Sequence, residues 1–226
     1  MAQTWPSILI PTQVDFYLAP MVMYGASTVS GLRQAVGTDA GYWQATLSGF
    51  QLRTPDQIRE WRAVVTAGQG GLGDILIGPF DCRQGARHTD GSFLSIVPHS
   101  DDAYFGDFTG YSQSQIVADV ATIAALRATS LTIDITGAGE LRRGMYFSIS
   151  ERLYMITSVP VVSGAQATFS FLPPLRAAAT AGTEVEMAHP FATMRLAAGA
   201  TGRQAIRMGK WSEPSIDLVE SFDGLS

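Results

Sequence analysis

Short runs of alternating apolar and polar residues, separated by glycine and polar turns, recur in the second half of the chain. They cover residues 129–135, 145–149, 153–159 and 166–171. Side chains of a β-strand point alternately to opposite faces, so a period of two predicts half-buried strands. Short strands at this spacing are typical of a small barrel or sandwich. The sequence therefore predicts a mainly β fold.

Further strand patterns occur towards both ends of the chain. Residues 14–18 and 22–24 predict two short strands interrupted by Pro20. We interpret the stretch that follows as rich in turns, because it contains Gly31, Gly37 and Gly41. Later strands are expected at residues 42–47, 75–77, 185–187, 193–196 and 215–220.

One helix is predicted over residues 55–67. Thr54 can cap its first turn, Pro55 suits the first helical position, and Gln57 completes a capping box. Gly68 is expected to end the helix in a left-handed conformation. The apolar side chains expected on one face, towards a sheet, are those of Ile58, Trp61 and Val65.

Residues 83–128 follow neither period and predict a long irregular loop, which is unusual inside a compact domain. This stretch is rich in glycine and aspartate, and it also carries aromatic residues. The loop packs either on a neighbouring subunit or on its own domain. The aromatic residues concerned are Tyr104, Phe105, Phe108 and Tyr111.

The charge and hydropathy of the chain argue against nucleic-acid binding, a membrane-spanning helix and a signal peptide. Charged residues make up 15% of the chain and the net charge is −5, with no basic stripe for nucleic-acid phosphates. No stretch approaches the roughly 18 apolar residues of a membrane helix, and the N-terminus does not resemble a signal peptide. We expect synthesis in the cytoplasm, and a sparsely charged surface that partners partly cover.

Possible reactive and metal-binding residues do not form a convincing constellation. Cys82 is the one cysteine, so neither an intrachain disulfide nor a thiolate metal cage can form. His88-Thr89-Asp90 lacks a nucleophile elbow. Asp101, Asp102 and Asp107 do not have the spacing of a calcium loop. We assign no catalytic, cofactor or metal residue.

Three further patterns have ordinary structural explanations. The segment 68–73 matches GxGxxG, but it follows a helix and precedes a strand, the reverse of a dinucleotide site. Asp134, Glu140 and Glu151 could in principle supply paired carboxylates for sugar hydrolysis, but each lies at a strand end or turn, where acidic residues are common. Among the tryptophans, we expect Trp43 and Trp61 in the core, and Trp5 and Trp211 at contact surfaces.

The order of these patterns resembles a group of phage and prophage tail proteins. The resemblance rests on the strand at 42–47 leading into the helix at Thr54-Pro55-Asp56-Gln57, on Leu153-Tyr154-Met155-Ile156, and on Pro173-Pro174-Leu175-Arg176. It covers most of the chain and is weakest in 83–128. The chain departs from the group where Met145, rather than an acidic residue, follows Gly144.

The resemblance implies a distal-tail or minor tail protein in the tail tip of the virion. Such a protein is expected to form a homo-oligomeric ring of six or three copies that links the tail tube protein to the hub and receptor-binding proteins. It implies a β-sandwich with one flanking helix in residues 1–82 and 190–226. An inserted small β-barrel or β-sandwich is expected in residues 129–189.

Two other functions stay open. Residues 129–189 could bind a carbohydrate of the host surface through exposed aromatic side chains. A hydrolase acting on cell wall is disfavoured by the missing catalytic constellation, so the chain is expected not to be an enzyme.

Overall fold

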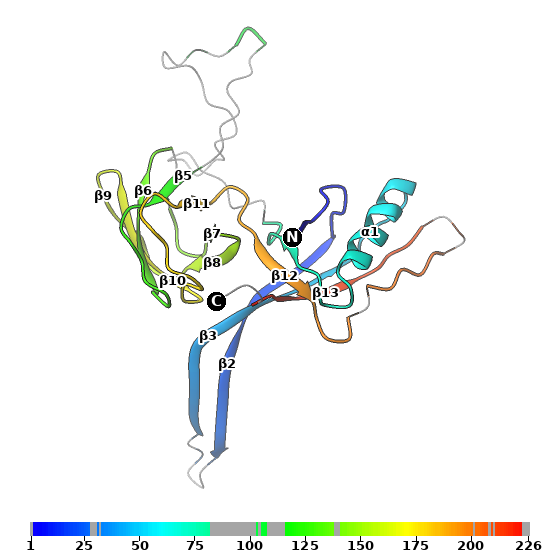
Figure 1. Ribbon diagram of the computed structural model, residues 1–226, viewed down its shortest axis with the longest axis horizontal. Coiled ribbons are helices and arrows are strands. Elements are labelled where there is room, and N and C mark those ends of the chain that lie inside the picture. Colours follow the sequence, from blue (N-terminus) through cyan, green and yellow to red (C-terminus); the bar gives the residue numbers. More distant parts are fainter. Residues whose placement is uncertain are drawn as a thin grey trace. The chain divides into compact units, whose positions relative to one another are not determined.

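The computed structural model describes residues 2–27, 31, 33–81, 103, 105–107, 116–137, 141–200, 202–207, 209 and 211–222. The chain divides into two compact units (Figure 1). The first comprises residues 1–80, 151–153 and 191–226, and the second comprises residues 81–150 and 154–190. Strands dominate both units, which confirms the mainly β fold expected from the alternation.

Apart from small shifts at residues 81–82 and 190, the structure differs from the expected domains at two places. Residues 151–153, at the start of β8 (Arg152–Ile156), belong to the first unit rather than to the second. Strand β5 (Val117–Val120) lies inside the stretch predicted to be an irregular loop. Two of its four residues are buried and alternate with one exposed and one partly buried residue, but so short a pattern is hard to recognise directly after a long glycine- and aspartate-rich stretch.

A six-stranded mixed sheet forms the framework of the first unit. Its strands, in spatial order, are β1 (Gln3–Thr4), β4 (Ile75–Ile77), β12 (Ala192–Leu196), β13 (Ile216–Glu220), β3 (Arg33–Ser48) and β2 (Gln13–Ser27). The β1–β4 pair is parallel and the other pairs are antiparallel. The described residues of this unit form this single sheet, and not the two facing sheets of the expected sandwich.

The helix of this unit, α1 (Pro55–Ala67), has the predicted bounds and the predicted capping box. The Thr54 hydroxyl accepts the Gln57 N–H at 3.3 Å, and the Gln57 Oε1 accepts the Thr54 N–H at 3.2 Å. Trp61 is buried as expected, and so is Val64, which the pattern did not single out. The Trp61 ring lies 4.8 Å from that of Phe50, so the apolar face of the helix packs on aromatic side chains.

The expected left-handed cap at Gly68 is wrong. Gly68 is right-handed, with φ −64°, and the backbone turns left-handed at Gln69 and Gly70 instead. A Cβ at Gly68 would lie 2.9 Å from Leu196 Cδ1. The glycine therefore allows the end of α1 to approach β12 closely.

The second unit is a closed six-stranded barrel. Its strands follow the order β6 (Ser130–Ile135), β5, β11 (Glu184–Glu186), β7 (Tyr146–Ile149), β8 and β10 (Gln166–Leu172), and β10 pairs with β6 to close it. A further strand, β9 (Val161–Ser163), pairs with β10. The alternation of β10 buries Ala167, Phe169 and Phe171. The structure thus confirms a small β-barrel here, one of the two expected forms.

Candidate assembly interface

Strands β2 and β3 form an antiparallel hairpin that continues past the other strands of its sheet (Figure 1). Their pairing runs from Gln13 opposite Ser48 to Ser27 opposite Arg33. Strand β13 covers the far side of β3 only between residues 44 and 47. We call residues 19–27 and 33–43, which lie beyond this cover, the ribbon.

The ribbon corrects the expectation of two short strands followed by turns. Pro20 lies at a shift of register inside β2, and Gly37 lies within β3. Proline is tolerated there because β2 is an edge strand, on which an N–H can be missing. A Cβ at Gly37 would lie 3.1 Å from Val22 Cγ2. The glycine therefore serves close strand pairing rather than a turn.

Large apolar side chains on the ribbon are exposed to solvent on both of its faces. Met23 lies opposite Val36, and these side chains are 80% and 63% exposed. Met21, on the same face two residues away, is 49% exposed. Tyr24 lies on the other face and is 66% exposed. Exposed apolar surface of this extent is typical of a surface that a protein partner covers.

The ribbon is also nearly free of charge. Arg33 and Asp39 are its two charged residues, and the Arg33 guanidinium lies 5.7 Å above the Tyr24 ring. Natural edge strands usually carry charged side chains that discourage pairing with another chain. Among the described strands, β2 is the last of its sheet and β3 has no second neighbour beyond Gln44. No further described strand therefore pairs with either edge of the ribbon.

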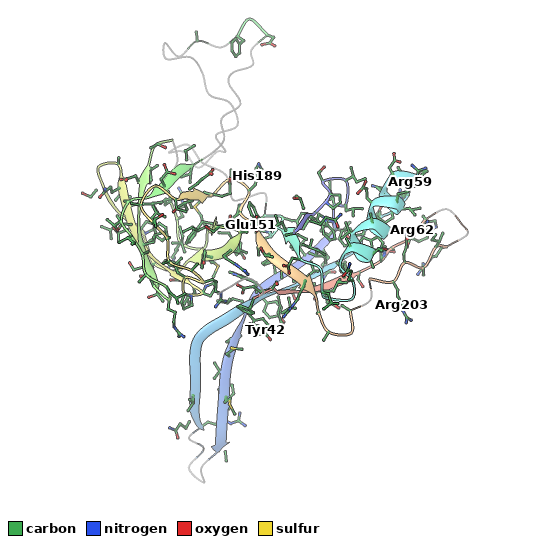
Figure 2. All side chains as sticks on the ribbon, in the orientation of Figure 1. Tyr42, Arg59, Arg62, Glu151, His189 and Arg203 are labelled. Carbon is green, nitrogen blue, oxygen red and sulfur yellow. The ribbon has the colours of Figure 1, made fainter. Side chains whose placement is uncertain are left out.

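The base of the ribbon is held by buried polar contacts. Trp43 is 1% exposed, and its backbone N–H donates to Glu220 Oε2 at 3.0 Å. Its indole N–H donates to the Leu153 carbonyl at 2.7 Å. Next to it, Gln44 Nε2 donates to the Tyr42 hydroxyl at 3.0 Å, where the ribbon leaves the sheet (Figure 2). A fixed base thus supports a long part in which β2 and β3 pair with each other.

The tryptophans fall partly where the sequence predicted them. Trp43 and Trp61 are in the core, as expected. The expected contact role of Trp5 is wrong, since Trp5 is 8% exposed and its indole N–H donates to the Leu9 carbonyl at 2.8 Å. Trp211 is half-buried, with the Arg207 guanidinium 5.2 Å above its ring.

The other candidate residues are scattered over turns and strands. Residues 68–73 join α1 to β4, as their glycines suggested. Asp134 lies on β6 opposite Asp119, and Glu151 lies in the turn before β8, where its carbonyl accepts the Thr193 N–H. Cys82, the segment 88–90, Asp101, Asp102 and Glu140 lie outside the described residues. In the part of the chain that is described, no group of three or more His, Cys, Asp or Glu side chains could hold a metal ion.

The signal that could have found the ribbon is its composition. Met21 to Tyr24 is an uncharged apolar run beside small residues, but Pro20 and the later glycines obscure it because proline and glycine usually mark turns.

Comparison with known proteins returned no relative: no protein-family model matches the chain, and no curated protein matches it either. No helix within the described ranges has the length and apolar character needed to span a membrane.

Proposed function

We propose that this chain is a structural subunit of the tail tip of a tailed bacteriophage, similar to distal tail proteins, and that its work is assembly into a ring. The observation that supports this most is the ribbon, which exposes large apolar side chains and which no further described strand covers at either edge. A two-stranded hairpin alone is marginally stable in water. Such a ribbon therefore gains stability when further strands cover it.

The two open edges suggest how copies would join. One edge belongs to β2 and the other to β3, and the two strands are antiparallel. The β2 edge of one copy can pair with the β3 edge of the next, which continues the same antiparallel pattern. A contact between two different surfaces of identical subunits generates a closed ring when the rotation that relates neighbouring subunits divides a full turn evenly. Obligate interfaces of this kind bury about 2,000 Å² or more.

The proposed position of the ring in the virion rests on the resemblance to phage tail proteins. We propose a ring of six or three copies between the tail tube protein and the hub. The carbohydrate-binding alternative gains no support from the described barrel. Most of its aromatic rings are packed in the core, namely those of Phe147, Tyr154, Phe169 and Phe171, and Tyr146 is half-buried.

Light scattering combined with negative-stain imaging of the purified chain tests the proposal. Rings of three or six copies are expected for the native chain. Met23→Lys should abolish them, because it places a charge on the ribbon at a side chain that is 80% exposed and contributes little to the isolated subunit. Leu72→Lys is the matched control, since Leu72 is 82% exposed on the connection between α1 and β4.

The control should keep the rings. A native chain without rings, or rings that persist in Met23→Lys, would contradict assembly through the ribbon.

A further inference from the structure

One strand of the second unit lies outside the closed ring of hydrogen bonds. β9 pairs with β10, and it is the last strand in the described order of its sheet (Figure 1). All three residues of β9 are exposed. Val161 and Val162 are 70% and 61% exposed, and the nearby Val159 is 70% exposed. An edge strand with exposed apolar side chains is prone to pair with another strand.

The hydrogen bonds of Ser170 show which backbone groups of β10 point towards the β8–β9 side. Its N–H donates to the Ser158 hydroxyl at 2.8 Å, and its carbonyl accepts the Thr157 N–H at 2.8 Å. Successive residues of a strand direct these groups to opposite sides. Thr168 and Gln166 therefore point the same way as Ser170.

It follows that Val162 directs its backbone outward. Thr168 is opposite Val161, and Gln166 is opposite Ser163, so these two residues of β9 use their N–H and C=O groups towards β10. Val162 lies between them, and its N–H and C=O groups face the open edge.

The side chain of Val162 lies on the core face of the sheet. Val162 is opposite Ala167, which is 0% exposed, yet Val162 itself is 61% exposed. The face of β9 that carries Val162 is thus continuous with the core-facing side of β10, but no other described strand covers it. A strand added to this edge would cover the valine.

We propose that β9 pairs antiparallel with β9 of a second copy of this chain, across a two-fold axis at Val162. The two Val162 residues then exchange both backbone hydrogen bonds, with Cα atoms about 5.5 Å apart. A two-fold contact brings identical charges together, which opposes pairing. No charged residue lies between Arg152 and Arg176, so this edge meets its own copy without that repulsion.

This contact is separate from the proposed ring. The ribbon joins two different edges, whereas β9 joins the same edge twice and so pairs copies strictly in twos.

Disulfide trapping tests the pairing. The full chain carrying Cys82→Ser and Val162→Cys is oxidised and examined on a non-reducing gel. The distance of about 5.5 Å suits a disulfide, which joins Cα atoms about 4.4–6.8 Å apart. A covalent pair of chains is expected from this variant. Cys82→Ser with Leu126→Cys is the control, because Leu126 is 58% exposed on the same unit, and it should stay single.

Two further variants separate this pairing from the ring. With Met23→Lys added, the Val162→Cys chain should still form the covalent pair. In the Met23→Lys chain that keeps Cys82, light scattering should give the mass of two chains. Adding Val162→Pro should reduce the mass to that of one chain. Proline lacks the N–H that faces the open edge, and its introduction leaves the hydrogen bonds between β9 and β10 in place. Failure of Val162→Cys to trap a pair, equal trapping by the Leu126 control, or a two-chain mass with Val162→Pro would overturn the proposal.

Discussion

Glu220 takes the place of a strand partner at the point where the ribbon leaves the sheet. The last residue pair between β13 and β3 is Val219 opposite Gln44. At the preceding residue of β3, the Trp43 N–H donates to the Glu220 carboxylate at 3.0 Å instead of to a backbone carbonyl. Glu220 is 2% exposed, so water cannot replace it. A side chain thus ends the hydrogen-bond ladder without leaving a buried donor unpaired.

Glu220→Ala should therefore lower the free energy of unfolding by about 1–3 kcal/mol, the range for a buried polar group that loses its partner. Urea titration followed by tryptophan fluorescence measures the loss. Glu213→Ala is the matched control, because Glu213 is exposed on the segment that leads into β13. It should change the free energy of unfolding by no more than about 0.5 kcal/mol. Equal losses in the two variants would mean that the Glu220 contact contributes nothing.

Among the elements, α1 and the ribbon show what a sequence can and cannot predict. The bounds of α1 follow from signals within a few residues, namely Thr54, Pro55 and Gln57, so the prediction is confirmed. The ribbon depends on pairing between residues far apart in the chain. Pro20 and Gly37 each indicate a turn locally, and that indication is overruled once the two strands lie side by side.

The short strands show the same limit. The sequence does not predict β5 and β9, of four and three residues, although it predicts β4 and β11, of three residues each. Both form because a long neighbour fixes them: β6 beside β5, and β10 beside β9. The candidate interface was missed for this reason too, since an open edge is a property of the sheet and not of one strand.

The capping box of α1 can be tested directly. Thr54→Ala removes the hydroxyl that accepts the Gln57 N–H, and it should lower the free energy of unfolding by about 0.5–2 kcal/mol. Thr66→Ala, at an exposed position near the other end of the same helix, should leave stability unchanged or slightly raised, because alanine favours helix. Thermal unfolding followed by circular dichroism compares the two. A loss in Thr66→Ala as large as that in Thr54→Ala would argue against a role for the cap.

For the whole molecule, the distribution of tryptophan gives each unit its own signal. All four tryptophans lie in the first unit, at positions 5, 43, 61 and 211. The barrel has a core of its own, in which Phe147, Phe169 and Phe171 pack with ring centroids 5.4–6.5 Å apart. Tryptophan fluorescence therefore reports on the first unit, while circular dichroism reports on both.

Strand β8 is divided between the two units. Its first residues belong to the first unit, where the Leu153 carbonyl accepts the Trp43 indole N–H at 2.7 Å, and Tyr154 onwards belongs to the barrel. Phe169→Ala should destabilise the barrel by about 3–5 kcal/mol. We expect the tryptophan transition in urea to move to lower concentration together with the circular dichroism transition. Leu126→Ala, at a residue of the same unit that is 58% exposed, should move neither. If Phe169→Ala instead splits the dichroism curve and leaves the tryptophan midpoint in place, the units unfold separately and the shared strand does not couple them.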